Sequence, residues 1–488
     1  MPQWLIRHRW LGIFVAISAG MLVLFAACGD DDEGGGEESP AATTEEASPA
    51  GAPCEGGSGV EGAGEPLKIG LLVPYTGALS TFGPDYESAA DLAAKCINNA
   101  GGVNGGEVEI VTGDDGTAAQ QAVTEATRLV EIEGVVGIVG GAASSVSLAV
   151  AESVTGPGQI LQISPASTSP SLTAANDSDF LFRTPISDAA QGVVLAQMVS
   201  EDLGFTSVCA MYVNNAYGQG LVNQFEESFT EAGGTLTAKV PHDDAQAVSY
   251  QSQLQECVAD DPEALVAISY PVGQATVYLR EALEGPLIDQ FVFVDGTKED
   301  DIFAELGWDQ FDGMKGTAAG ALKLEFGEEF DTNFEAEYGE PYSSPFVREA
   351  FDAVVVTALA AAAAGTNTDS VAIRDALRDV SNEPGTEYGP GIIESPEDLS
   401  AALEAAAGGE DINYSGASGS VDFDENGDVL FGAIEVWSID AANEDLVTEE
   451  IFSVDLVTGE VESIGAPETE GDGSPSPAED EESPTASP

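Results

Sequence analysis

Glycine and serine residues follow a short apolar run in the first third of the chain. The run 135–139 leads into Gly140-Gly141-Ala142-Ala143-Ser144-Ser145, after which an amphipathic stretch begins. Glycine lets a ligand approach the backbone, and a serine that caps a helix presents a hydroxyl beside free N–H groups. These donors and the helix dipole would hold a carboxylate, with Ser144 or Ser145 as the serine. A helix cap without any ligand would have the same sequence.

A second hydroxyl-rich segment and a lone carboxylate end two other apolar runs. Ser164-Pro165-Ala166-Ser167-Thr168 follows the run 160–163, and Asp295 follows the run 291–294. Hydroxyl and N–H groups suit a carboxylate, whereas the carboxylate of Asp295 suits an ammonium group. Together these groups predict a site for a zwitterion such as an amino acid. For each segment taken alone, the alternative is an ordinary turn.

Catalytic and metal sites have little support in the sequence. The chain has two histidines, His8 and His242, so a Ser-His-Asp triad or a His-rich metal site would have to use His242. Segment 422–428 resembles the first half of a calcium loop, but Ala433 stands at the twelfth position, where a bidentate Glu is needed. A β-turn is therefore the better interpretation. We expect no catalytic residue, no cofactor and no bound metal.

Alternating short apolar runs and longer amphipathic stretches predict the elements that position these loops. The expected strands are 67–73, 108–112, 135–139, 207–213, 236–240, 264–270, 291–294, 419–423 and 433–439. The expected helices are 85–99, 118–131, 144–154, 188–202, 218–232, 248–258, 345–364 and 370–379. Apolar strands separated by helices indicate parallel sheets covered on both faces, and such sheets bind ligands at the carboxyl ends of their strands. The series starts again near residue 185, which predicts two lobes with a cleft between them.

Six short segments occur in an order that resembles one known family. They are Tyr75-Thr76-Gly77 with Phe82-Gly83, Asn98 to Gly105, Ile163 to Thr168, Phe182 to Pro185, Ala216 to Gly220, and Gly419 to Asp428. In these segments, residues 66–440 resemble the type I periplasmic binding proteins of branched-chain amino-acid (Leu/Ile/Val) ABC importers. The resemblance implies an α/β fold of two Rossmann-like lobes joined by three hinge crossovers, and it implies binding without catalysis.

The resemblance also implies roles for individual residues. It places a carboxylate-binding serine in the 144–145 loop, a backbone carbonyl of Ala166 and the hydroxyl of Thr168 at the ligand, and an acid, Asp295, at its ammonium group. Tyr217 would close over the ligand by hinge closure of the two lobes. The expected ligand-binding residues are Phe82, Ser144, Ser145, Ala166, Thr168, Tyr217, Tyr270 and Asp295.

The N-terminal residues predict export. Basic residues 7–9 precede the uncharged apolar run 10–27, which is typical of a signal peptide, although eighteen such residues could also remain as a membrane-spanning anchor. Phe25-Ala26-Ala27-Cys28 resembles a lipoprotein cleavage box, with Phe where Leu is usual. We expect a signal peptide over 1–27 and a lipid on Cys28 that anchors the chain to the outer face of the cytoplasmic membrane.

Four cysteines follow Cys28, and an exported chain can form disulfides. Cys209 ends a strand-like run and Cys257 ends a helix-like run in the same predicted lobe, so these two are the preferred pair. Cys54 with Cys96 follows by elimination. Buried or unpaired thiols are the alternative for both pairs.

The charge of the chain excludes several partners. The formal net charge is −72, and 68 of the 86 acidic residues lie between residues 66 and 465. Like-charge repulsion excludes nucleic acid and disfavours anionic lipid headgroups. Such an acidic body also suggests a salty milieu, in which counterions screen the repulsion.

These observations predict the organisation and partners of the chain. After the signal peptide we expect a disordered acidic linker at 28–65, lobe I at 66–184 and 317–416, lobe II at 185–316 and 417–458, and a disordered acidic tail at 459–488. The expected partners are a small ligand (an amino acid, an amide or a related compound), an ABC permease, and the membrane through the lipid, for a monomeric protein. The alternatives are a sensing receptor with the same fold and an exported hydrolase.

Overall fold

The structure is a computed structural model that describes residues 54–55, 57–60, 62–320, 324–389, 391–393 and 395–465, without the side chains of 324–326. The predicted signal peptide, Cys28, most of the linker and the tail beyond residue 465 lie outside these residues. Among the helices of the described part, none is both long enough and apolar enough to cross a membrane.

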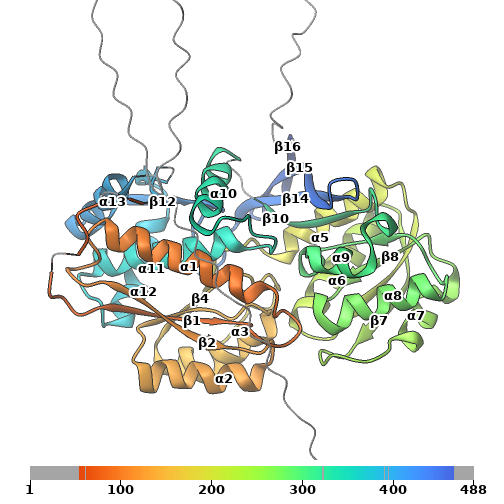
Figure 1. The fold of residues 1–488 in the computed structure, drawn as a ribbon, viewed down its shortest axis with the longest axis horizontal. Coiled ribbons are helices and arrows are strands. Elements are labelled where there is room, and N and C mark those ends of the chain that lie inside the picture. The colour runs from red at the N-terminus through yellow and green to blue at the C-terminus, as the bar shows by residue number, and fades with distance from the viewer. Residues whose placement is uncertain are drawn as a thin grey trace, which may run out of the picture. The chain divides into compact units, whose positions relative to one another are not determined.

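Lobe I is built on a five-stranded parallel sheet in the order β2-β1-β3-β4-β5. Its strands are β1 (Leu67–Val73), β2 (Val108–Asp114), β3 (Gly137–Gly140), β4 (Leu161–Ser164) and β5 (Leu181–Arg183). The helices between them are α1 (Phe82–Asn99), α2 (Ala119–Arg128), α3 (Ser144–Val150) and α4 (Gly156–Gly158). Figure 1 shows α1 on one side of this sheet and α2 on the other, so the apolar strands are covered on both faces.

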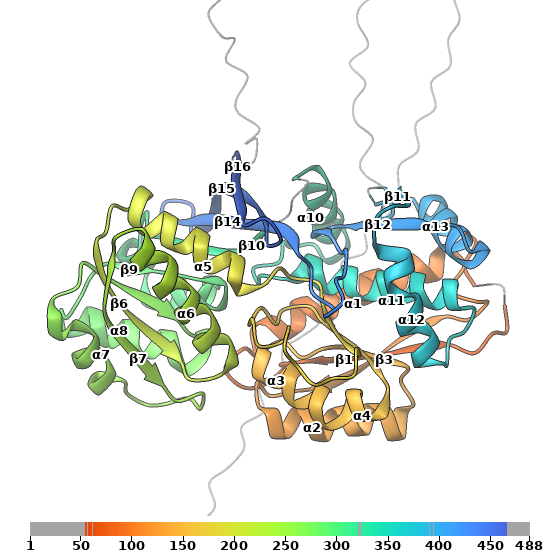
Figure 2. The ribbon, with the colours of Figure 1, turned by 180° about the vertical axis from the view of Figure 1, so that it is seen from behind.

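Lobe II repeats the same strand order, β7-β6-β8-β9, in a second parallel sheet (Figure 2). Its strands are β6 (Ser207–Val213), β7 (Thr235–His242), β8 (Ala264–Ile268) and β9 (Phe291–Val292). Its helices are α5 (Asp188–Gln197), α6 (Ala216–Glu231), α7 (Gln251–Cys257), α8 (Thr276–Glu284) and α9 (Asp300–Leu306). The predicted pair of Rossmann-like lobes is confirmed.

An antiparallel sheet in the order β10-β14-β15-β16 extends lobe II. Its strands are β10 (Lys315–Gly320), β14 (Phe431–Asp440), β15 (Asp445–Asp455) and β16 (Glu460–Gly465). A bridge between Phe293 and Gly316 joins it to the end of β9. β16 lies inside the segment 459–488 that the sequence assigned to a disordered tail, so paired structure continues to residue 465.

The remaining helices complete lobe I around one apolar helix. They are α10 (Leu324–Tyr338), α11 (Val347–Ala364), α12 (Ser370–Ser381) and α13 (Pro396–Gly408), with the short strands β11 (Thr386–Tyr388), β12 (Ile412–Gly416) and β13 (Gly419–Ser420). Most side chains of α11 are buried because it contacts α1, α12, α13 and the sheet, as expected for a helix that is apolar on all sides. The chain passes between the lobes three times, after β5, after β10 and after β13, as predicted.

Both predicted disulfides are present: Cys209–Cys257 within lobe II, and Cys54–Cys96, which joins the segment before β1 to α1. Each closes a loop of roughly 40 to 50 residues, which typically stabilises a fold by about 2–4 kcal/mol. The backbone N–H groups of Gly59 and Gly64 also donate to lobe I carbonyls at 3.2 and 2.8 Å. The described end of the segment assigned to a disordered linker is therefore part of the folded body.

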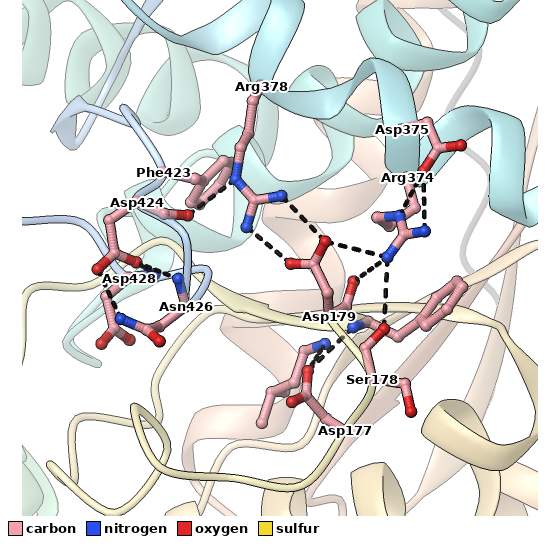
Figure 3. A network of polar contacts seen from close by, with 12 residues as sticks. Asp177, Ser178, Asp179, Arg374, Asp375, Arg378, Phe423, Asp424, Asn426 and Asp428 are labelled. Carbon is pink, nitrogen blue, oxygen red and sulfur yellow. Dashed lines mark hydrogen bonds and ion pairs between the residues drawn. The ribbon is translucent and has the colours of Figure 1, made fainter.

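Two arginines of α12 fasten the loop before β5 (Figure 3). Arg374 and Arg378 donate to the carboxylate of Asp179 at 3.0 and 2.8 Å. Their guanidinium groups also lie over the rings of Phe180 and Phe182, 4.3 and 4.8 Å from the ring centroids. Cation–π contacts and a shared carboxylate therefore hold α12 against this edge of lobe I.

The acid-rich segment 422–428 forms a turn beside this cluster. Oδ1 of Asp424 accepts from the backbone N–H groups of Asn426 at 2.7 Å and Asp428 at 2.9 Å, and Arg378 donates to its carbonyl at 2.8 Å. Asp428 instead pairs with buried Arg183 at 2.7 Å. These carboxylates therefore stabilise the third crossover.

Candidate ligand-binding site

A buried pocket lies where loops from the carboxyl ends of both parallel sheets meet. Its lining residues are Leu79, Phe82, Tyr86, Ala142, Ala143, Ser144, Ala166, Tyr217, Tyr270, Asp295, Gly296 and Phe346. Six of the eight residues predicted from the sequence are among them: Phe82, Ser144, Ala166, Tyr217, Tyr270 and Asp295. The cavity volume is about 20 Å³, room for about one water molecule, so the two walls are close together.

The serine loop of lobe I is held by contacts that the sequence did not reveal. A side chain at Gly140, whose φ is 137°, would put its Cβ 2.0 Å from the carbonyl oxygen of Leu72, so the protein's own packing requires glycine there. Ser144 is the first residue of α3 and not its cap, which is Ala143. The Ser144 hydroxyl accepts from the backbone N–H of Ser169 at 3.2 Å. The predicted helix-capping role is wrong, and the hydroxyl instead joins this loop to the loop after β4.

Ser145 and Thr168 are not part of the pocket lining. Ser145 is half-buried on α3, and Thr168 is buried, with its hydroxyl next to the carboxylate of Asp188. The carbonyl of Thr168 accepts from the guanidinium of Arg183 and from the N–H of Asp188, both at 2.8 Å. Arg183 therefore holds the backbone of the loop after β4 without lining the pocket. Its place in a predicted hinge did not reveal this role.

Asp295 lies on the opposite wall, in the 3₁₀ turn Asp295–Thr297 that follows β9. Its Oδ1 accepts from the hydroxyl of Tyr217 and from Nε2 of Gln191, both at 2.8 Å. Burial raises the pKa of Asp295 to about 6, although these hydrogen bonds favour the charged form. The carboxylate is therefore buried, oriented and ionised at neutral pH.

Two stacked tyrosines complete the wall of lobe II. The rings of Tyr217 and Tyr270 are 5.7 Å apart and nearly parallel, at 12°. Asn215 donates to the Tyr270 hydroxyl at 3.0 Å, and its own side-chain oxygen caps α6 by accepting from Gly218 at 3.2 Å. One cap residue thus fixes both the start of α6, which carries Tyr217, and the ring of Tyr270.

A second buried carboxylate, Asp188, interacts electrostatically with Asp295. Asp188 begins α5 and is fully buried, next to the hydroxyl of Thr168. Burial and the charge of Asp295 raise the pKa of Asp188 well above its usual range. No sequence pattern pointed to this residue, because an acid in the first turn of a helix is usually solvated.

Tyr86 and Phe346 are pocket residues that sequence reasoning missed. Tyr86 lies four residues after Phe82 on α1, so the helical spacing of the two aromatics was an available signal. Phe346 precedes α11 with φ 67°, a left-handed conformation that is rare for a bulky residue. Such residues tend to occur at functional sites, and Phe346 contributes its ring to the cavity wall.

The hydrolase alternative depended on His242, which the structure places in the core of lobe II. Its Nε2 lies 2.6 Å from Oγ of Ser269, and its ring packs edge-on against Tyr250 at 5.2 Å. His242 and Ser269 are 2% and 0% exposed, and neither lines the pocket. Burial also lowers the pKa of His242. The pair therefore packs within lobe II, away from the pocket.

Two hydrogen bonds connect the lobes beside the pocket. Oγ of Ser169 in lobe I donates to the carbonyl of Ala216 in lobe II at 2.7 Å, and the N–H of Val272 in lobe II donates to the carbonyl of Ala78 in lobe I at 3.1 Å. The lobes are thus closed on each other at both edges of the cavity.

Comparison with known proteins agrees with this arrangement. Residues 66–404 match a family model described as Periplasmic binding protein. The chain belongs to the periplasmic binding protein family. The resemblance predicted from the six segments is thereby confirmed, and this family is one of substrate-binding proteins.

Two curated periplasmic binding protein relatives show the extent of the similarity. The chemotactic signal transduction system substrate-binding protein BasB of Halobacterium salinarum is 28% identical over 377 residues, 74% of this chain and 84% of that protein. The leucine-, isoleucine-, valine-, threonine- and alanine-binding protein of Pseudomonas aeruginosa is 28% identical over 320 residues, 65% and 83% of the two chains.

Solved structures of periplasmic binding proteins share the fold. The leucine-binding protein LivK from Thermotoga maritima superposes with a TM-score of 0.65 at 24% identity, covering 79% of this chain and 98% of that one. LivJ from Streptococcus pneumoniae, in complex with isoleucine, gives 0.64 at 21% identity, covering 82% and 100%. At these identities the likeness confirms the two-lobed fold alone.

Proposed function

We propose that this periplasmic binding protein is an exported lipoprotein that binds an amino acid or a related zwitterion between its lobes and delivers it to an ABC permease. The observation that carries the proposal is the facing of Ser144 and Asp295 across one cavity, a loop with hydroxyl and N–H donors against a buried carboxylate. The name of the Pseudomonas relative, which binds leucine and four other amino acids, supports the ligand class.

The mechanism we propose is closure around the ligand. The ligand's carboxylate docks on the 140–144 loop, and its ammonium group meets Asp295 and Tyr217 when lobe II closes. Because the closed cavity has a volume of only about 20 Å³, the walls must part to admit an amino acid and then close on it less tightly. The permease would recognise the ligand-loaded, closed form. No bond in the ligand changes.

The variant Asp295→Asn tests the proposal. Loss of the buried ammonium partner should weaken amino-acid binding by about 2–5 kcal/mol, measured by isothermal titration calorimetry with the amino acids that raise the melting temperature of the native protein. Asp289→Asn, which removes an exposed acid of the same lobe, is the matched control and should bind as the native protein does. Unchanged affinity in Asp295→Asn would remove this residue from the site.

A sensing receptor is the second candidate function, supported by the similarity to a relative named for chemotactic signal transduction. The two candidates share the pocket and differ in the partner that reads the closed form. A deletion strain distinguishes them: loss of uptake of the labelled ligand indicates transport, whereas loss of migration toward the ligand with normal uptake indicates sensing.

Anchoring is proposed from the sequence, because Cys28 lies outside the described residues. The export signal and the cleavage box at residues 25–28 support a lipid on that thiol. Incorporation of labelled palmitate into the native chain is the expected result, and a chain released unlabelled into the medium would contradict the anchor.

A further inference from the structure

One side chain in the cavity wall has a polar group that the protein does not satisfy. Tyr86 is fully buried, lines the pocket, and its hydroxyl has no hydrogen-bond partner. A buried hydroxyl without a partner costs free energy, which a ligand group able to bond with it would recover. The unsatisfied hydroxyl of Tyr86 therefore indicates which chemical groups a bound ligand would have.

In the proposed pose the charged ends of the ligand lie at Ser144 and Asp295 with Tyr217, and the larger side chains left to line the other end of the pocket are Leu79, Phe82, Tyr86, Tyr270 and Phe346. The hydroxyl of Tyr270 accepts a hydrogen bond from Asn215, so among these five Tyr86 alone has a polar atom without a partner. A purely aliphatic ligand would fill this end and leave the hydroxyl unsatisfied.

The charged groups that act most strongly on the Tyr86 hydroxyl are acids. Burial and then the carboxylates of Glu349, Asp85, Asp295 and Glu299 raise the pKa of Tyr86 well above its usual range. Glu349 and Glu299 are themselves buried, and burial raises the pKa of each to about 7. Where these acids are ionised, which for Glu349 and Glu299 is above about pH 7, they favour a ligand group that carries N–H donors or positive charge and disfavour a carboxylate.

We propose that the ligand is an amino acid whose side chain ends in an N–H donor, an amide or a cationic amine, and that Tyr86 accepts a hydrogen bond from it. This inference rests on the proposed zwitterion site and narrows it from amino acids in general to those with a nitrogen-bearing side chain. It assigns Tyr86 the role of a specificity-determining residue.

Ligands of matched shape test the inference by calorimetry on the full chain. Leucine, asparagine and aspartate have the same branched side-chain outline, which ends in two methyl groups, an amide and a carboxylate respectively. Norleucine and lysine form a longer pair, in which lysine carries an additional terminal ammonium group. We expect asparagine or lysine to bind tighter than its apolar partner, and aspartate to bind weakest. The variant Tyr86→Phe should lower the affinity for the nitrogen-bearing ligand by about 5- to 150-fold. It should change the affinity for the apolar ligand by less than about threefold.

Tyr278→Phe is the control, since Tyr278 is equally buried but lies in the core of lobe II, outside the pocket. It should leave all five affinities unchanged. Because Tyr86→Phe removes only an unsatisfied hydroxyl, its ligand-free melting temperature should not fall.

The possible outcomes separate this inference from the proposed function. Tighter binding of leucine and norleucine, or equal loss for apolar and nitrogen-bearing ligands in Tyr86→Phe, would overturn the role of Tyr86 and leave the zwitterion site standing. If the native protein binds none of these five but binds another, apolar zwitterion, this inference alone fails. If no zwitterion binds the native protein, the proposed function fails as well.

Discussion

Asp295 combines two properties that constrain its use as an ammonium partner. It is 3% exposed, and burial raises its pKa to about 6. Burial and then the charge of Asp295 raise the pKa of Asp188 well above its usual range. Only the ionised form of Asp295 attracts an ammonium group, so protonation competes with the ligand.

Ligand affinity should therefore depend on pH in the mildly acidic range. Between pH 8 and 7 Asp295 is ionised and affinity should be constant, whereas below its pKa of about 6 affinity should fall by about tenfold per pH unit. Calorimetric titrations from pH 8 to pH 5 would measure this. The same series on Asp295→Asn should be much flatter, and a flat profile in the native protein would contradict an ammonium contact at this carboxylate.

The sequence predicted those site residues whose place follows from strand ends. Ser144 and Asp295 stand directly after apolar runs, and parallel topology brings such positions to one edge of a sheet. Phe346 could not be predicted in this way, because it reaches the cavity from the loop before α11, and its position depends on how α11 packs against the sheet. Thr168 had the right place in the chain, but Arg183 holds its carbonyl and keeps it out of the cavity wall.

At the scale of elements, Arg183 on β5 connects the loop after β4 to the third crossover. Its Nε pairs with Asp428 at 2.7 Å, and its Nη1 donates to the carbonyls of Thr168 and Ser169 at 2.8 and 2.9 Å. Arg183 and Asp428 are 1% and 4% exposed. A buried pair of this kind contributes little as a pair, but removing one member leaves the other charged and unsatisfied.

Arg183→Met should accordingly lower the free energy of unfolding by about 3–5 kcal/mol, measured by urea denaturation. Arg280→Met, which breaks the exposed ion pair with Glu305, is the control and should cost less than about 1 kcal/mol. Similar losses in the two variants would show that the buried pair has no special role in the hinge.

Element prediction succeeded where hydrophobic periodicity was clear. The bounds of β1 (Leu67–Val73) and β6 (Ser207–Val213) agree with the predicted runs. The strands β15 and β16 were missed because acidic residues are dense in them and one face stays exposed, so neither an apolar run nor a clean alternation is visible. Their pairing depends on where β14 lies in the folded protein. No local sequence pattern carries this information.

At the scale of the whole molecule, basic residues are too few to balance the acids. Ten of the twelve Lys and Arg residues between positions 66 and 465 form ion pairs within the described residues, against 68 acids in the same span. The acids of this span therefore outnumber its bases by 56. The repeated strand order of the two lobes, in contrast, was predictable, since it follows from the recurrence of strand–helix units along the sequence.

Salt should stabilise the protein. Raising KCl from 0.1 to 1 M shortens the screening length from about 10 to about 3 Å, which weakens repulsion between surface acids. We expect the melting temperature of the ligand-free chain to rise over this range, measured by differential scanning calorimetry. A constant or falling melting temperature would show that the surface charges are spaced too widely to matter.

Stability should also decrease as the pH rises toward 8. Burial raises the pKa values of Asp115, Glu299 and Glu349 to about 7, so the folded state holds protons that the unfolded chain has already released. Their contribution is complete below the ordinary values of 3.8 to 4.5 and is lost as the pH rises through 7. The melting temperature in 1 M KCl, where surface repulsion is screened, should fall between pH 5 and pH 8. Glu349→Gln, which cannot ionise, should reduce this fall.

The disulfide between Cys54 and Cys96 sets how the body would bear a pull from its anchor. If a lipid on Cys28 held the chain to the membrane, a pull on the body would enter its described part at Cys54. The disulfide would pass this tension directly into the long helix α1 instead of through the first strand of the sheet. A force on the protein would thus act on the covalent disulfide bond. It would not pull apart the hydrogen bonds that pair β1 with its neighbouring strands.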